Sequence, residues 1–259
     1  MSDAVKALNQ QRWGAAADGY VHSAAHADSD SLQRLIDMAQ PQPSWRMLDV
    51  AAGGGHTALA FAPHVALVVA YDLTSEMLRA ARSSAGERPN VRWVQGDAEA
   101  LPFHAAFDLV TCRLAAHHFP DVPRFLREAA RVLRAGGLLL VQDHLAPTRA
   151  KDRSYVDTFE KLRDPSHLRA LNLYEWRRHC RDAGLHICEE QVHETRHTLL
   201  PWAQRQRCTP ETILWLQIML AQAPSAVRAY LQPQDVGTPF ASFVTPNLYL
   251  CARKLDSAG

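Results

Sequence analysis

The segment Leu48-Asp-Val-Ala-Ala-Gly-Gly-Gly-His-Thr-Ala-Leu59 ends a β-like run in a glycine cluster and then opens a helix. Glycine lets the backbone turn tightly at such a point and lets a ligand approach without a Cβ in the way. A flexible loop between two elements is the alternative interpretation. No third glycine stands three residues after Gly55, which counts against a nicotinamide dinucleotide site.

Acidic residues follow the next two apolar runs. Asp72 comes directly after the second run, and Gln95-Gly-Asp-Ala-Glu99 follows the third. Ligands of open α/β sheets bind at the edge where the parallel strands end, and a carboxylate after the second strand can accept hydrogen bonds from both ribose hydroxyls. The sequence therefore predicts a nucleoside-type ligand at this edge.

Short apolar runs alternate with helical patterns from about residue 45 to residue 144, which is typical of a parallel sheet covered by helices. Helices are expected over residues 75–84 and 122–135, and Asp121 can cap the second one. Beyond Pro147 the patterns are mostly helical and include two helices that a minimal sheet does not need, at residues 210–220 and 224–231. The expected strands are residues 46–51, 66–72, 91–95, 107–112, 138–143, 185–195 and 248–253.

The composition is that of a globular protein with one large domain. The 259 residues are 47% hydrophobic and 21% charged, and 28 Lys and Arg nearly balance 27 Asp and Glu, for a net charge of +1. No strong overall field favours nucleic acid or an anionic membrane. The absence of a secretory signal pattern and of a long apolar stretch predicts a cytoplasmic protein without membrane insertion. Five cysteines without a C-x-x-C pair indicate neither a disulfide framework nor a cysteine zinc site.

Five ordered motifs resemble those of class I S-adenosylmethionine-dependent methyltransferases. They are Leu48-Asp-Val-Ala-Ala-Gly-Gly-Gly-His56, Val69-Ala-Tyr-Asp-Leu-Thr-Ser-Glu-Met-Leu78, Val94-Gln-Gly-Asp-Ala-Glu-Ala-Leu-Pro-Phe103, Phe107-Asp-Leu-Val110 and Leu133-Arg-Ala-Gly-Gly-Leu-Leu-Leu140. Arg113-Leu-Ala-Ala-His-His-Phe119 and Leu162-Arg-Asp-Pro-Ser-His-Leu-Arg169 resemble a bacterial small-molecule branch related to the quinone C-methyltransferases. The resemblance covers about residues 13–185.

The resemblance implies an α/β, Rossmann-like sheet of seven strands, six parallel and the last antiparallel, with a helical lid. It implies a helical cap over the cofactor at residues 1–44 and a methyltransferase domain at residues 45–259, in which residues of about 145–173 and 196–245 are lid insertions. Insertions of this length usually cover a site.

The resemblance also assigns roles in binding S-adenosylmethionine. Gly53 and Gly55 would let the backbone run close to the methionine part of the cofactor. Asp72 would hold the ribose, and Asp97 with the Ala98 amide would bind adenine. Ala51 departs from the motif because it stands where the family has its first glycine. The full set of expected cofactor residues is Tyr20, Asp49, Ala51, Gly53, Gly55, Asp72, Leu73, Met77, Asp97, Ala98, Cys112 and Arg113.

Three histidines are candidates for a general base. His117 and His118 follow the fourth expected strand, and His144 follows the fifth, so all three lie at the ligand edge of the sheet. An imidazole there can remove a proton from a hydroxyl, an amine or an acidic carbon. The alternative for each is a structural histidine, bonded to the backbone, to the cofactor carboxylate or, for His144, exposed at the surface.

His193-Glu-Thr-Arg-His197 matches the H-E-x-x-H zinc-protease string. That chemistry needs both histidines on one face of a helix, whereas the preceding residues alternate like a strand. On a strand the two side chains stand about 13 Å apart, too far to bind one metal ion at ligand distances of about 2 Å. A metalloprotease is therefore not expected.

The sequence predicts a metal-independent methyltransferase that converts S-adenosylmethionine to S-adenosylhomocysteine. The acceptor is expected to be a small organic molecule methylated at O, N or C, and the protein a monomer or homodimer. The acceptor is partly apolar or aromatic if the apolar residues of the later helices line its pocket; alternatively they pack on the sheet. A protein that binds the cofactor without methyl transfer and a nicotinamide-dependent oxidoreductase are the rival functions. The apolar candidates are Trp202, Ile213, Trp215, Leu216, Ile218, Met219 and Tyr230.

Overall fold

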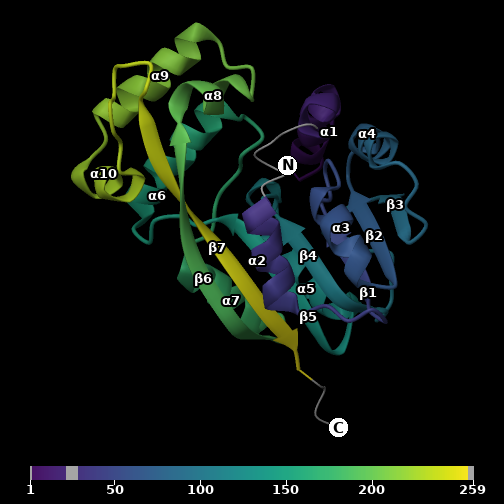
Figure 1. Cartoon of the computed structure of the whole chain (residues 1–259). Coiled ribbons are helices and arrows are strands. Elements are labelled where there is room, and N and C mark those ends of the chain that lie inside the picture. Colours follow the sequence, from purple (N-terminus) through teal and green to yellow (C-terminus); the bar gives the residue numbers. More distant parts are fainter. Residues whose placement is uncertain (1, 22–28, 256–259) are drawn as a thin grey trace.

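The computed structural model describes residues 2–21 and 29–255 and contains one seven-stranded sheet. Its strand order is β3-β2-β1-β4-β5-β7-β6, seen in Figure 1 with β3 at one edge and β6 at the other. Strands β1 to β5 pair in parallel, and β7 is antiparallel to both β5 and β6. Six strands thus share one direction and β7 opposes them, which confirms the expected Rossmann-like methyltransferase sheet.

The strands carry the buried apolar runs of the sequence. They are β1 (Arg46–Val50), β2 (Leu67–Asp72), β3 (Val91–Gln95), β4 (Phe107–Arg113), β5 (Leu133–His144), β6 (Leu185–Thr198) and β7 (Ser242–Lys254). The helices are α1 (Ser2–Val21), α2 (Ser29–Ala39), α3 (His56–Phe61), α4 (Ser75–Ala85), α5 (Val122–Val132), α6 (Ala150–Arg163), α7 (Leu173–Asp182), α8 (Leu199–Gln204), α9 (Pro210–Ala221) and α10 (Ser225–Leu231). Short 3₁₀ turns are η1 (Ala62–His64) and η2 (Ala116–His118).

Each face of the sheet has its own hydrophobic core, and alternate residues of a strand belong to one core or the other. In β1, Leu48 and Val50 join the core under α5 and α7, whereas Met47 joins the core under α2 and α3. Because successive side chains of a strand point to opposite faces, both faces of a central strand are buried. The sheet is therefore rigid on both sides of the edge where the glycine turn lies.

A third core joins the helices that follow β5 and β6. Helices α6, α8, α9 and α10 pack around Phe159, Trp202 and Phe243 at the far end of the long strands β6 and β7 (Figure 1). These helices lie in the segments expected to be lid insertions. Residues 196–198 and 242–245 of the second segment belong to β6 and β7, because the two strands pair along their whole length, from Leu185 with Lys254 to Thr198 with Ser242.

The helix expected over residues 122–135 is shorter than predicted. Asp121 caps it as expected, since its side chain accepts a hydrogen bond from the backbone N–H of Arg124. The helix ends at Val132, because Leu133 has an extended backbone and pairs with Phe107 of β4. The pairing of β5 with β4 therefore competes with the helical pattern and begins before the two glycines that were expected to stop the helix.

Helix α1 packs beside α4 (Figure 1). Three of its side chains contact distant residues: Lys6 binds Asp97, and Asn9 and Gln10 donate to the backbone carbonyls of His118 and Leu73. No helix in the described residues is long and apolar enough to cross a membrane.

Candidate active site

The glycine turn after β1 has a left-handed backbone at three positions. The φ angles are +56° at Ala51, +53° at Gly53 and +79° at Gly55. A Cβ at Gly55 would lie 2.7 Å from the Trp93 ring, so both the backbone angle and the packing require glycine there. Ala51 adopts the same backbone region at a steric cost that a glycine would not have.

Asp72 holds the turn in place. One carboxylate oxygen accepts a hydrogen bond from the backbone N–H of Gly53 at 2.8 Å, and the other accepts one from the N–H of Thr74 at 2.8 Å. Burial raises the pKa of this carboxyl, and the two N–H groups oppose that rise. The Thr74 side chain interacts with the same carboxylate, which leaves about one of its lone-pair positions to accept a further hydrogen bond.

The acidic residues that follow β3, Asp97 and Glu99, are bound by the N-terminal helix α1. Asp97 Oδ1 accepts a hydrogen bond from the backbone N–H of Glu99, and its Oδ2 lies 2.7 Å from Lys6 Nζ. The same ammonium lies 2.5 Å from Glu99 Oε2. Gln10 of α1 donates to the backbone carbonyl of Leu73. Helix α1 thus contacts the ends of both β2 and β3.

These groups line one cavity, which we call the first cavity. Its wall includes Ala51, Gly53, Asp72, Leu73, Met77, Asp97, Ala98 and Arg113 of the expected cofactor residues. The remaining wall is Lys6, Asn9, Trp13, Ala52, Gly54, His56, Thr57, Tyr71, Thr74, Gly96, Glu99, Leu114, Ala115, His118, Phe119 and Pro120. Eight of the expected residues therefore come together around one space.

The other expected cofactor residues lie elsewhere. Asp49 and Cys112 are 1% exposed within β1 and β4. Asp49 accepts a 2.6 Å hydrogen bond from Thr111, and burial raises the pKa of its carboxyl to about 7. Gly55 supports the turn against Trp93. The side chain of Tyr20 lies outside the described part of α1.

A second cavity adjoins the first. Trp13, Arg113, Leu114 and His118 line both cavities. Arg113 donates to Thr57 Oγ1 at 3.0 Å and to Ser31 Oγ at 3.3 Å. The remaining wall of the second cavity is Ser29, Ser31, His117, Gln142, His144, Arg163, Asp164, Thr195, His197, Trp202, Arg205, Gln206, Thr245, Asn247 and Tyr249.

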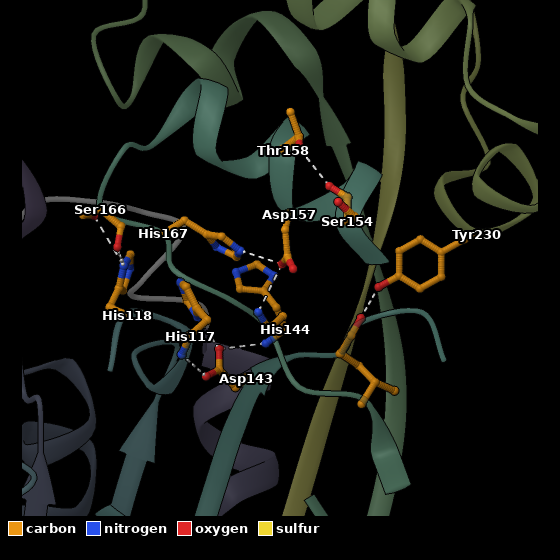
Figure 2. A network of polar contacts seen from close by, with 12 residues as sticks. His117, His118, Asp143, His144, Ser154, Asp157, Thr158, Ser166, His167 and Tyr230 are labelled. Atoms are coloured by element: carbon orange, nitrogen blue, oxygen red, sulfur yellow. Dashed lines mark hydrogen bonds and ion pairs between the residues drawn. The ribbon is translucent and has the colours of Figure 1, made fainter. Parts of the chain in front are cut away.

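The three expected base residues all line the second cavity, and Asp143 binds two of them (Figure 2). Nδ1 of His117 lies 2.5 Å from Asp143 Oδ1, and the backbone N–H of His117 donates to Oδ2 at 2.9 Å. The backbone N–H of His144 donates to Oδ1 at 2.8 Å. The carboxylate fixes the His117 ring, so its other nitrogen, Nε2, is the one left to accept a proton from a ligand.

His118 is held differently. Its Nδ1 lies 2.9 Å from the backbone carbonyl of Ser166, to which it donates, and its ring meets Trp13 edge-on. Burial lowers the pKa of His118 and lowers the pKa of both His117 and His144 well below the ordinary value. All three rings are therefore neutral near pH 7 and able to accept a proton.

The sequence did not single out Asp143 or Asp157 as residues that orient histidines. His167 of the Arg-Asp-Pro-Ser-His motif bonds through Nε2 to Asp157 Oδ1 at 3.0 Å, and its ring lies 5.2 Å from the His117 ring. Asp143, the next-to-last residue of β5, was visible next to His144 in the sequence, but its bond to His117 forms only because β4 and β5 end side by side. The adjacent Asp164 binds Ser166 in a tight turn.

His117, Asp143 and His144 form the one group in the described residues whose ligand atoms, all within 4.8 Å of one another, could hold a metal ion. Asp143 already accepts hydrogen bonds from His117 and His144. A reaction without a metal therefore stays a prediction.

The H-E-x-x-H string lies on β6, which confirms the strand expected there. His193 bonds to Gln191 at 2.9 Å and His197 bonds to Thr245 at 2.8 Å. Neither contact resembles the helical arrangement that a zinc protease needs.

The chain is similar to known methyltransferases. Residues 48–141 match the family described as a methyltransferase domain. The protein named uncharacterised methyltransferase YcgJ, from Bacillus subtilis (strain 168), is 43% identical over 171 residues, which are 65% of this chain and 68% of YcgJ. The ubiquinone/menaquinone biosynthesis C-methyltransferase UbiE of Dinoroseobacter shibae is 35% identical over 149 residues, 55% of this chain and 53% of UbiE.

Two solved structures share the fold over most of the chain. The structure of YcgJ from Bacillus subtilis superposes with a TM-score of 0.84 at 35% identity, covering 88% of this chain and 99% of YcgJ. BH2331 from Bacillus halodurans C-125 gives 0.83 at 36% identity, covering 88% of this chain and all of that one. From the turn, the acidic cavity and these relatives together, we conclude that the chain belongs to the class I S-adenosylmethionine-dependent methyltransferases.

Proposed function

We propose that the first cavity binds S-adenosylmethionine, that the second binds a small organic acceptor, and that His117 removes a proton from the acceptor as it is methylated. The shared wall carries this proposal. Because Arg113, Leu114 and His118 line both cavities, a donor in one and an acceptor in the other would meet there. Methyl transfer needs such an in-line approach in a site that excludes water.

The residues of the first cavity suit the cofactor. Asp72 lines the cavity and would accept a hydrogen bond from the ribose, and Asp97 with the Ala98 amide would hold adenine. Gly53 leaves space at the turn, where an added Cβ would touch the Met77 methyl group at 3.5 Å. The carboxylates Asp72, Asp97 and Glu99 also suit a ligand that carries a sulfonium charge.

The bound cofactor supplies an electrophilic methyl group: the acceptor atom bonds to the methyl carbon as the sulfur–methyl bond breaks, and S-adenosylhomocysteine leaves as a neutral thioether. His117 would take the acceptor's proton on Nε2 while Nδ1 donates to Asp143. Asp143 is then a positioning residue that also stabilises the imidazolium. His118, which lines both cavities, and His144 are the alternative bases.

The acceptor would be methylated at O, N or C. Trp202 and Tyr249 give the second cavity a partly aromatic wall. We expect a cytoplasmic enzyme, monomeric or homodimeric, that works without a metal.

The test is to incubate the purified protein with a metabolite extract and deuteromethyl-labelled S-adenosylmethionine, and to follow products by mass spectrometry. We expect a product with the heavy methyl group and an equal amount of S-adenosylhomocysteine. His193→Ala is the matched control for His117→Ala, because His193 lies on β6 outside the wall of the second cavity. Cofactor binding with no methylated product in any extract would instead support a binding protein without transfer.

A further inference from the structure

The two cavities have opposite charge patterns. Among the described residues, the wall of the first cavity has three carboxylates, Asp72, Asp97 and Glu99, and two cations, Lys6 and Arg113. Counted in the same way, the wall of the second cavity has three guanidinium groups and one carboxylate, which are Arg113, Arg163, Arg205 and Asp164. A cavity lined mainly by cations favours an anionic ligand.

The lone carboxylate of the second cavity already has partners. Asp164 accepts hydrogen bonds from Ser166, both from its backbone N–H and from Oγ, and from Gln206 Nε2 at 3.1 Å. Arg12 of α1 lies 3.7 Å from its Oδ1. Burial alone would raise the pKa of Asp164, but the Ser166 hydrogen bonds and the nearby Arg163 outweigh it and hold that pKa below its usual value. The carboxylate is therefore ionised, and its charge is engaged with Arg12 and the turn.

The histidines add no positive charge to this wall near pH 7. Burial, together with repulsion from Arg205 and Arg163, lowers the pKa of His197 to about 4. Burial likewise lowers the pKa of His117, His118 and His144. The guanidinium groups therefore determine the sign of the potential.

Arg163 is held by an aromatic ring and not by a carboxylate. Its Cζ lies 4.3 Å from the centroid of the Trp202 ring, and its Nε donates to the Trp202 backbone carbonyl at 3.1 Å. Among the described residues, no ion pair joins Arg163 to an acid. A stacked, half-buried guanidinium is pre-organised for a carboxylate or phosphate, which it can bind through two N–H groups.

Few apolar side chains reach this cavity. Of the seven candidates in the later helices, only Trp202 is in the wall, and Leu216 is fully buried in the third core. Ile213, Met219 and Tyr230 pack against the same core, and Trp215 is half exposed. Most of these residues thus pack in the protein core and do not line the acceptor cavity, as the alternative interpretation of the sequence stated.

Two buried amide oxygens of wall residues have no hydrogen-bond donor within the described part of the chain. They are Asn247 Oδ1 and Gln142 Oε1. Asn247 Nδ2 donates to the Thr245 carbonyl, which fixes the amide orientation and leaves Oδ1 as the unpartnered atom. Because both oxygens are buried below the cavity surface, they are not placed to contact a ligand directly.

We propose that the acceptor bears an anionic group, a carboxylate or a phosphate, which Arg163 binds with help from Arg205. This inference rests on the proposed methyl transfer and names the acceptor class. It places the anion beside Trp202 and a hydroxyl or amine toward His117. A neutral quinone-like acceptor would make no charge-assisted hydrogen bond with the stacked Arg163 guanidinium.

The experiment separates a metabolite extract by ion exchange at pH 7.5 into anionic, neutral and cationic fractions. Each fraction is incubated with the full chain and deuteromethyl-labelled S-adenosylmethionine. We expect the labelled product to arise from the anionic fraction. Pretreatment of that fraction with phosphatase removes the label if the anion is a phosphate ester and leaves it if the anion is a carboxylate.

Variants then test the arginines with the acceptor so found. We expect Arg163→Gln and Arg205→Gln to raise the KM for the acceptor about 10- to 100-fold, with kcat little changed and S-adenosylhomocysteine binding unchanged. Arg207→Gln, an exposed site near Arg205 outside the wall, should match wild type. Arg205 is itself exposed, so its variant should fold even if Arg163→Gln does not.

The outcomes are distinguishable. Label arising only from the neutral or cationic fraction overturns the anionic acceptor and leaves methyl transfer intact. Unchanged KM in a folded Arg163→Gln or Arg205→Gln protein overturns the assigned contacts. Binding of S-adenosylhomocysteine with no label from any fraction overturns the proposed function and the inference with it.

Discussion

The two cavities are built in different ways. The turn of the first cavity and its acids come from one stretch, residues 51–99, where strand ends and backbone N–H groups fix each side chain. The second cavity draws on η2, β5, β6, β7 and the helices that follow them, and side chains such as His117 and Arg163 define it. Binding of a common cofactor is thus encoded locally, whereas recognition of the acceptor depends on how distant segments pack.

The largest expected effect is on turnover in the second cavity, with no change of cofactor affinity in the first. Replacing His117 by Ala should lower kcat by about 100- to 10,000-fold, because no group would take the acceptor's proton. The affinity for S-adenosylhomocysteine should stay unchanged, since His117 is not in the wall of the first cavity. The labelled-methyl assay and calorimetry measure the two quantities.

The pH profile checks the same ring. Burial keeps the pKa of His117 well below its ordinary value, so kcat should be level near pH 7 and fall only at acidic pH, as the folded protein takes up this proton. The His193→Ala variant should keep wild-type turnover. A His117→Ala protein with full activity would remove the base from the second cavity.

The next effect lies beneath the first cavity, where Asp49 is buried. Its pKa rises from 3.8 to about 7 on folding, so between these values the folded chain holds a proton that the unfolded chain has lost. The stabilisation of the fold by this buried, protonated carboxyl is fully present below pH 4 and is lost as the pH rises through 7. Asp49→Asn should remove it, which changes the stability difference from wild type by about 2 to 4 kcal/mol between pH 4 and pH 8.

Urea unfolding across this range measures that difference. The asparagine variant should gain relative to wild type as the pH rises, and Asp37→Asn, at an exposed site on α2, should show no comparable trend. A difference for Asp49→Asn that does not vary with pH would contradict the buried, protonated carboxyl.

A smaller effect tests the acid that lines the first cavity. Asp72→Asn should weaken cofactor binding by about 1 to 3 kcal/mol, because a ribose hydroxyl and the N–H groups of Gly53 and Thr74 lose part of their acceptor. The KM for the acceptor should not change. Calorimetry on Asp72→Asn and on the exposed control Asp37→Asn checks this, and equal affinities in all proteins would take Asp72 out of the site.

The smallest effect concerns the strained alanine of the turn. Because Ala51 has a φ of +56°, Ala51→Gly should stabilise the fold by about 0.5 to 1 kcal/mol. The neighbouring Ala52 does not share this backbone region, so Ala52→Gly should be destabilising. Urea midpoints of the two variants should shift in opposite directions, and shifts of the same sign would argue against strain at Ala51.

The first cavity could be predicted because its residues follow strand ends at short spacing. Gly53, Asp72 and Asp97 lie at one sheet edge, as their positions after three successive strands indicate. The same rule could not tell which side chains line the cavity and which are buried in the core. Asp49 and Cys112 were expected to bind the cofactor, but both are buried within β1 and β4.

The second cavity could be predicted only in part. The positions of His117 and His118 after the fourth strand and of His144 at the end of the fifth indicated a shared edge, and the structure brings them together. The bond of His117 to Asp143 and the stacking of Arg163 on Trp202 depend on tertiary packing, for which the sequence has no local pattern. The length of β6 and β7 was underestimated because their mutual pairing overrides polar residues at the ends.

The central claim is that the first cavity binds the cofactor and the second holds the acceptor and its base. It is tested most directly by calorimetric titration of S-adenosylhomocysteine into wild type, Asp72→Asn and His117→Ala. The account predicts one site per chain, weakened in Asp72→Asn and as tight as wild type in His117→Ala. Equal weakening in both variants, or no binding to wild type, would contradict it.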